Sequence, residues 1–112
     1  MTDNNESAAK ISIHEVCGAA PLTGTNGIKV HKLILSLWEL SKTIEVDFTN
    51  VAPSVTFLNE AIGELIAQFK KAEIVSKLKV TGLSAADKKL LNGIVVNRYH
   101  SRANAERIKK LP

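Results

Sequence analysis

Hydrophobic and polar positions follow two periods along the chain, and the shorter period marks three strands. Apolar and polar residues alternate at 11–16, ISIHEV, which predicts a first strand. The β-branched, apolar run TIEVDF at 43–48 is typical of a central strand. At 77–83, KLKVTGL, lysines alternate with Leu78 and Val80, which predicts a strand with one exposed face or an edge position.

Helical spacing follows each of these runs. Apolar residues cover most of a helix predicted from Ile28 to Leu40, so this helix lies deep against a sheet or also contacts a partner, and a homodimer is one such pairing. A second helix with one apolar face begins near Phe57. A third follows Ser84, which resembles the first residue of a capping box. Gly93 lies inside this third helix, where close packing would be one reason for a glycine.

The resulting order is strand, helix, strand, helix, strand, helix. Strands joined by crossover helices pair in parallel, so the sequence predicts a small α/β layer structure with a central, mostly parallel sheet and helices packed on it. We expect a disordered N-terminal tail at 1–10 and one domain at 11–100. A basic extension at 101–112 follows, which can continue the last helix.

Length and composition fit one domain. The 112 residues, 45% of them apolar, suffice for a single core. No apolar run reaches the roughly 20 residues of a membrane span, and the first residues lack the pattern of a signal peptide, so we expect a cytoplasmic protein that does not contact a membrane. The only cysteine, Cys17, excludes an intrachain disulfide and is expected to be a small, half-buried residue.

The net charge of +4 comes from the C-terminal end. Residues 98–112 hold five Lys/Arg and one acid, which accounts for the whole excess (5 − 1 = +4). The cations are candidate contacts to nucleic-acid phosphates, and they are Arg98, Arg102, Arg107, Lys109 and Lys110. Only one aromatic residue, Tyr99, accompanies them, so a solvated helix end is favoured over a base-stacking surface.

Signatures of catalysis are largely missing. The three histidines are scattered, no serine lies in a G-x-S-x-G turn, and no cysteine or histidine cluster has metal-ligand spacing, so we predict neither an enzyme nor a cofactor or metal. A glycine-rich stretch offers one alternative, an anion or nucleotide site formed by Gly24, Thr25, Asn26 and Gly27. It lacks the full phosphate-loop spacing, which favours a plain turn at the start of a helix.

The stretch VDFTNVAPSVTFLNEAIGEL at 46–65 concentrates polar residues where a strand ends and a helix begins. Such strand ends are where α/β sheets meet ligands and partners. The candidate partner contacts are Asp47, Asn50, Ser54, Thr56, Asn59 and Glu60. The hydroxyls of Ser54 and Thr56 can cap the helix, or one of them can accept a phosphate beside a helix start that favours anions.

The same stretch carries a family resemblance. The run V-D-F-T-N-V followed by S-V-T-F-L-N-E-A-I-G-E-L resembles the STAS-like family of unknown function, small bacterial proteins related to the STAS domains of sulphate transporters and anti-sigma factor antagonists. TGTNGIKVHKLI before it and TGLSAADKKLLNGIV after it support the resemblance, which covers roughly residues 11–100. It implies a sheet with helices packed on it and a function of binding rather than catalysis.

The resemblance also implies a possible switch. Anti-sigma factor antagonists present a serine at a helix start in an Asp-Ser-Ser-Gly-Leu motif, and a kinase-like anti-sigma factor binds and phosphorylates it. Here the corresponding turn is Ser54, Val55, Thr56, Phe57 and Leu58. Ser54 replaces the aspartate, Val55 the first serine and Phe57 the glycine. Thr56 therefore becomes the first candidate phosphoacceptor and Ser54 the second.

The sequence thus favours a regulatory protein–protein interaction module. Its partner, by resemblance, is a histidine-kinase-like ATPase that contacts residues 49–64, with phosphorylation as an added switch. Two alternatives stay open: association with nucleic acid through the basic C-terminal segment, and binding of a small molecule or nucleotide at 23–27.

Overall fold

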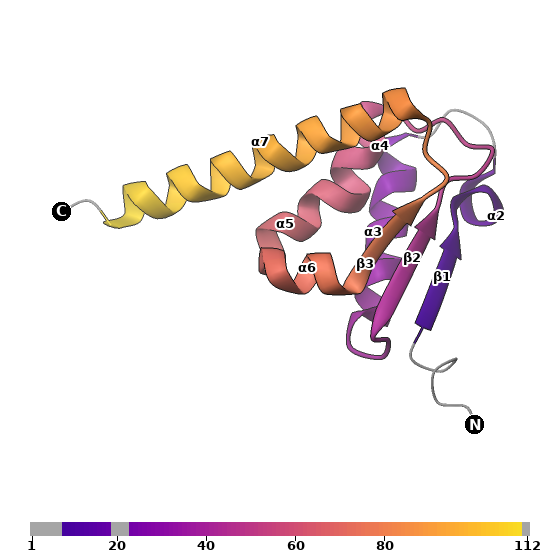
Figure 1. Ribbon diagram of the computed structural model, residues 1–112, viewed down its shortest axis with the longest axis horizontal. Coiled ribbons are helices and arrows are strands. Elements are labelled where there is room, and N and C mark those ends of the chain that lie inside the picture. Colours follow the sequence, from indigo (N-terminus) through magenta and orange to yellow (C-terminus); the bar gives the residue numbers. More distant parts are fainter. Residues whose placement is uncertain (1–7, 19–22, 111–112) are drawn as a thin grey trace.

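Three parallel strands form the central sheet. The computed structural model describes residues 8–18 and 23–110, with side chains described as far as residue 101. The strands are β1 (Ala8–Ser12), β2 (Thr43–Asp47) and β3 (Leu78–Thr81), and they pair in that order (Figure 1). This parallel sheet with helices packed on it confirms the predicted α/β fold class.

The crossovers between the strands are helical. Their elements are α2 (Ile13–Cys17), α3 (Gly24–Trp38), α4 (Val55–Leu58), η1 (Asn59–Gly63), α5 (Glu64–Gln68) and α6 (Lys71–Lys77). The elements α4, η1 and α5 form one helix with a π-helical turn in its middle. The last helix, α7 (Ala85–Lys110), contacts α4, η1 and α5 and runs through the predicted basic extension (Figure 1).

The sheet has one apolar and one polar face. Ile11, Ile44 and Val46 point into the core beneath the helices. Lys10, paired in register with Glu45, points the other way, because successive side chains of a strand alternate between faces. The face away from the helical layer is therefore a polar surface rather than a second apolar core.

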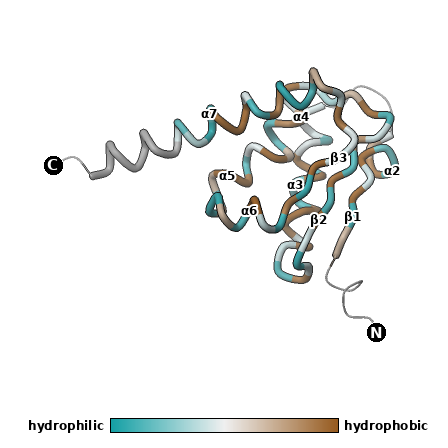
Figure 2. Tube along the Cα trace, in the orientation of Figure 1, coloured by the Kyte–Doolittle hydropathy of each residue, from teal (hydrophilic) through white to brown (hydrophobic). Residues whose placement is uncertain are grey.

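Aromatic side chains hold the helices on the sheet. The rings of Phe48 and Phe57 meet edge to face with centroids 6.0 Å apart, and both are buried. This contact joins the end of β2 to the start of α4. Trp38, predicted to be in the core, is buried and stacks on Phe69 at 4.3 Å. Figure 2 shows how hydrophobic and hydrophilic positions alternate along the helices and strands that supply these residues.

The first strand lies earlier than predicted. It begins at Ala8, inside the segment expected to be a disordered tail, whereas residues 1–7 lie outside the described part of the chain. It ends at Ser12, whose hydroxyl accepts a hydrogen bond from the Glu15 N–H (3.4 Å) and caps α2. The alternation at 11–16 was misleading because Ile11 ends a strand and Ile13 begins a helix, yet both are buried.

Three further expectations need correction. Helix α3 begins at Gly24, four residues before the predicted start at Ile28, because Thr23 caps it. The short helix α6 was not predicted, since none of its residues is buried and its apolar signal is weak. A Cβ on Gly93 would meet nothing within 4 Å, so close packing does not explain this glycine.

The longest helix is a polar one. Helix α7 has 26 residues, many of them charged. Within the described part of the chain, no helix combines the length and the apolar character needed to cross a membrane.

Candidate functional site

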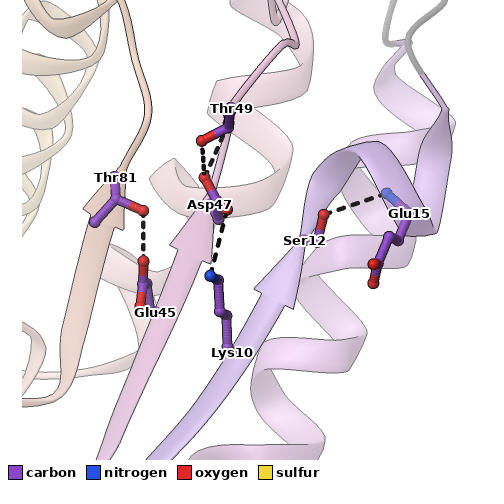
Figure 3. Close-up of polar contacts among 7 residues, drawn as sticks. All are labelled: Lys10, Ser12, Glu15, Glu45, Asp47, Thr49 and Thr81. Carbon is purple, nitrogen blue, oxygen red and sulfur yellow. Dashed lines mark hydrogen bonds and ion pairs between the residues drawn. The ribbon is translucent and has the colours of Figure 1, made fainter.

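Polar side chains at the carboxyl ends of the strands form one edge of the candidate site. Asp47 ends β2, and its Oδ1 accepts hydrogen bonds from the Thr49 N–H (2.9 Å) and hydroxyl (2.6 Å) (Figure 3). The Lys10 ammonium lies 3.6 Å from Oδ2. The Thr49 hydrogen bonds lower the pKa of Asp47; loss of solvent partly opposes them, and the Lys10 charge adds a lesser lowering. Asp47 is thus an ionised anchor for the turn that follows.

The turn after β2 is fixed by backbone contacts. The Phe48 N–H donates to the Thr81 carbonyl (2.8 Å), and the Val51 N–H donates to the Phe48 carbonyl (3.0 Å). Asn50 has φ +62°, in the left-handed region that asparagine adopts more readily than most residues. Asp47 and Asn50, both predicted as partner contacts, therefore shape this turn, and their contact with a partner stays a prediction.

The neighbouring turn at Gly82 closes one side of this edge. Gly82 has φ +81°, and a Cβ there would lie 2.5 Å from the Thr49 nitrogen and 2.8 Å from the Asp47 Oδ1. Only glycine fits this conformation and this approach. The turns after β2 and β3 consequently approach each other through their backbones.

The start of α4 presents three consecutive residues to solvent. The Ser54 hydroxyl accepts a hydrogen bond from the Phe57 N–H (3.0 Å), which makes Ser54 the N-cap residue. Val55 is 53% exposed, and Ser54 and Thr56 beside it are also exposed. Phe57 and Leu58 directly after them are fully buried. Two buried side chains thus anchor a short surface of hydroxyls around an exposed valine.

A π-helical turn follows within the same helix. In η1 the Glu64 N–H donates to the Asn59 carbonyl, five residues earlier instead of the usual four. Such turns widen a helix locally and are frequent at functional sites. Here the turn occurs one helical turn after the exposed residues of α4.

Arg98 of α7 crosses this π-helical turn. Its Nε donates to the Asn59 Oδ1 (3.0 Å), and its guanidinium pairs with the Glu64 carboxylate at 2.5 Å. Gly63 makes room for this contact, because a Cβ there would lie 3.2 Å from the Arg98 Nε. Asn59, predicted as a partner contact, and Arg98, predicted as a nucleic-acid contact, therefore bind each other and hold α7 in place.

A groove lies between the start of α4 and α7. It encloses about 330 Å³. Its lining residues are Val55, Asn59, Ile94, Asn97, Arg98 and Ser101. Sequence reasoning did not identify Val55, Ile94, Asn97 or Ser101 as site residues. Nothing in the local pattern sets Asn97 or Ser101 apart from a solvated helix. Val55 did carry a signal, because an apolar residue between two hydroxyls has no capping role.

The glycine-rich stretch forms the first turns of α3. The Asn26 Oδ1 accepts from the Thr23 N–H (3.1 Å), and the Thr23 hydroxyl accepts from the Asn26 N–H (3.3 Å), which together form a capping box. Asn26, predicted as an anion ligand, therefore has a structural role. Thr25 is exposed next to it.

The two glycines of this stretch face α4. A Cβ on Gly24 would lie 3.0 Å from the Thr56 Cγ2, and a Cβ on Gly27 would lie 2.7 Å from the Phe57 carbonyl oxygen and 2.8 Å from the Glu60 Cβ. Close helix packing thus accounts for both glycines, and nucleotide binding there stays a prediction. The contact also brings together two stretches that the sequence suggested as separate sites.

The remaining basic residues and possible metal ligands add little. Arg102, Arg107, Lys109 and Lys110 lie on α7 beyond the side chains that the structure describes, so their contact with nucleic acid stays a prediction. Within the described residues, no three His, Cys, Asp or Glu side chains could hold a metal ion together. Burial raises the pKa of the half-buried Cys17 thiol, with a smaller opposing effect of the Lys29 charge.

Comparison with known proteins places the chain in one family. No curated protein and no solved structure matches it significantly. A family model described as a STAS-like domain of unknown function (DUF4325) matches residues 26–88, more than half of the chain. The match includes most of α3, and all of β2, the turn after β2, the start of α4 and β3. The chain therefore belongs to this family of STAS-like domains, a family that points to a regulatory module.

Proposed function

We propose that this STAS-like domain is a non-enzymatic regulatory module that binds a protein partner through residues 49–64. The observation that carries the proposal is the start of α4, where Ser54, Val55 and Thr56 are exposed directly before the fully buried Phe57 and Leu58. A surface residue anchored in this way keeps its position, so little conformational entropy is lost when a partner binds.

The chemistry of this surface suits a protein rather than a small ligand. Val55 offers an apolar contact, and the hydroxyls of Ser54 and Thr56 surround it with polar groups, as in an interface with an apolar centre and a polar rim. The groove beside Val55 can receive a side chain of the partner. By the family resemblance, the partner is a histidine-kinase-like ATPase.

Phosphorylation of this surface is a second part of the proposal. The hydroxyl of Ser54 is occupied as the helix cap, and its use as an acceptor would disturb a contact worth about 1 kcal/mol. Thr56 has no capping role and is exposed, so it remains the first candidate acceptor. A phosphate there would add charge to the rim directly beside Val55, the apolar centre of the surface, and weaken partner binding.

Binding is tested with paired valine variants. A histidine-kinase-like ATPase encoded beside this chain is titrated with wild-type protein and with Val55→Asp and Val75→Asp in a calorimeter. Val75 is 69% exposed on α6 and serves as the matched control. We expect Val55→Asp to weaken binding at least tenfold, as at an interface hot spot, and Val75→Asp to leave it unchanged. Equal affinities for both variants would contradict the proposed surface.

Phosphorylation has its own test. Wild-type protein, Thr56→Ala and Ser54→Ala are incubated with the same ATPase and ATP, and intact masses are measured. We expect one added phosphate in the wild type and in Ser54→Ala, and none in Thr56→Ala. An unchanged wild-type mass under conditions where the complex forms would exclude the switch but leave the binding function intact.

A further inference from the structure

The outward face of α3 carries a second hollow, on a different surface from the start of α4. It encloses about 480 Å³. Its lining residues are Thr25, Ile28, Lys29, Lys32, Leu33 and Ser36. The opposite face of α3 already supplies the core with Val30, Ile34 and Trp38, all buried. Ile28 is nevertheless 45% exposed, so this helix shows apolar surface that the described part of the chain leaves open.

Two lysines border this hollow. Lys29 and Lys32 are exposed, and neither forms an ion pair within the described part of the chain. The Lys29 ammonium makes one long hydrogen bond, 3.4 Å, to the Val16 carbonyl. Aliphatic lysine stems line apolar surface while the ammonium groups stay at its rim, which gives the hollow an apolar floor and a positive edge.

We propose that this hollow docks an amphipathic helical segment of another protein that carries carboxylates beside its apolar face. An apolar side chain of the segment would contact Ile28 and Leu33, and its Asp or Glu residues would pair with Lys29 and Lys32. Helices commonly bind grooves through apolar residues three and four positions apart, and complementary charges at the rim select the partner. This surface is separate from the one proposed for the start of α4.

Charge also argues against a second copy of this chain as the occupant. In a twofold-symmetric pairing each surface meets itself, so the lysines of one copy face the same lysines of the other. Whether the two helices run parallel or antiparallel, pairing centred on the hollow brings Lys29 and Lys32 of one copy close to those of the other, and like charges at such a contact repel. An acidic segment gains attraction at the same two positions.

The test uses peptides selected from a random display library. Peptides about 16 residues long, enough for four helical turns, are selected on the folded wild-type protein. We expect binders with apolar residues at helical spacing and flanking Asp or Glu. In fluorescence polarisation, Lys29→Glu/Lys32→Glu should weaken them roughly tenfold. A peptide with its acids changed to lysine should recover binding to that double variant. Lys79→Glu, an exposed lysine on the sheet, is the matched control.

Three results would overturn this inference. One is the selection of no binder, and another is a set of binders that tolerate the double reversal as well as the control. The third is self-association of the wild-type chain in sedimentation that Ile28→Ser abolishes, which would assign the hollow to a second copy. Circular dichroism confirms that each variant is folded. Because Val55→Asp should leave the peptide affinity unchanged, failure here and failure of the α4 surface are distinguishable.

Discussion

The helix formed by α4, η1 and α5 is held on its two sides by different kinds of contact. On the α3 side, Gly27 lets the backbones approach so closely that a Cβ would lie 2.7 Å from the Phe57 carbonyl oxygen. On the α7 side, Arg98 binds Asn59 and Glu64 beside an open groove. The first contact depends on shape, whereas the second adds polar groups that solvent reaches to the apolar packing of Leu90, Leu91 and Ile94.

This difference bears on the partner surface proposed at the start of α4. The start of α4 is positioned on the sheet by the steric contact with α3, which salt does not weaken. The contact with α7 can loosen, because the Arg98 and Glu64 side chains are 26% and 40% exposed and their attraction is screened by ions. Salt should therefore weaken the polar part of the α7 contact and leave the α3 contact unchanged.

The largest expected effect comes from filling the α3 contact. Gly27→Ala should lower the free energy of unfolding by about 1–3 kcal/mol, because the new methyl group would meet backbone and the Glu60 Cβ at 2.8 Å. Urea denaturation measures the free energy of unfolding in low and in high salt, and the loss relative to wild type should be the same in both. A stabilised Gly27→Ala protein would show that this contact is looser than its geometry implies.

Breaking the polar contact should cost less and depend on salt. Arg98→Ala removes the hydrogen bond to Asn59 and the pair with Glu64, which we expect to lower the free energy of unfolding by about 1–2 kcal/mol. Arg98→Lys keeps the positive charge and should recover part of this loss. The recovery should be incomplete, because an ammonium lacks the forked geometry of a guanidinium. The loss should shrink in high salt. A loss of stability that does not change with salt would mean that the α7 contact, like the α3 contact, depends on shape rather than on charge.

Much of the fold follows from local patterns. The run at 43–48 predicts β2 almost residue for residue, since β-branched residues favour strands. The apolar spacing after Phe57 likewise predicts a helix over a stretch that the structure divides among α4, η1 and α5. Short elements were harder to predict, because α2 and α6 have too few residues for a period to be visible.

The candidate site was only partly predictable for a different reason. Its polar composition was visible, since Ser54 and Thr56 stand where the helical pattern after β2 begins. The pairing of Asn59 with Arg98 was not, because the two residues are 39 positions apart and no local spacing connects them. The same holds for Gly27, whose packing against Phe57 and Glu60 depends on how two helices cross.

A smaller change in stability, of opposite sign, is expected at Gly93, an exposed position of α7. Gly93→Ala should raise the free energy of unfolding by about 1 kcal/mol, because alanine favours a helix interior and the new methyl group meets nothing within 4 Å. Urea denaturation measures the free energy of unfolding of this variant and of Gly27→Ala, and so compares the same substitution in open space and in a close helix contact. If both variants are destabilised, packing around Gly93 is closer than the structure shows.

The smallest expected effect concerns the turn that leads into α4. Because hydrogen bonds from Thr49 and the nearby Lys10 charge lower the pKa of Asp47 from its ordinary value of 3.8, the ionised carboxylate stabilises the folded state. This contribution is present above the ordinary pKa and is lost as pH falls through the lower folded-state value. Asp47→Asn keeps an oxygen for Thr49 but cannot titrate. The stability of this variant, measured by urea denaturation at pH 7 and near pH 3, should therefore fall less on acidification than that of the wild type.

Lys10→Gln should change the pH profile less than Asp47→Asn does, because Thr49 lowers the pKa of Asp47 more than Lys10 does. Parallel profiles for wild type and Asp47→Asn would mean that the turn does not depend on this charge, leaving its shape to Asn50 and the backbone bonds of Phe48.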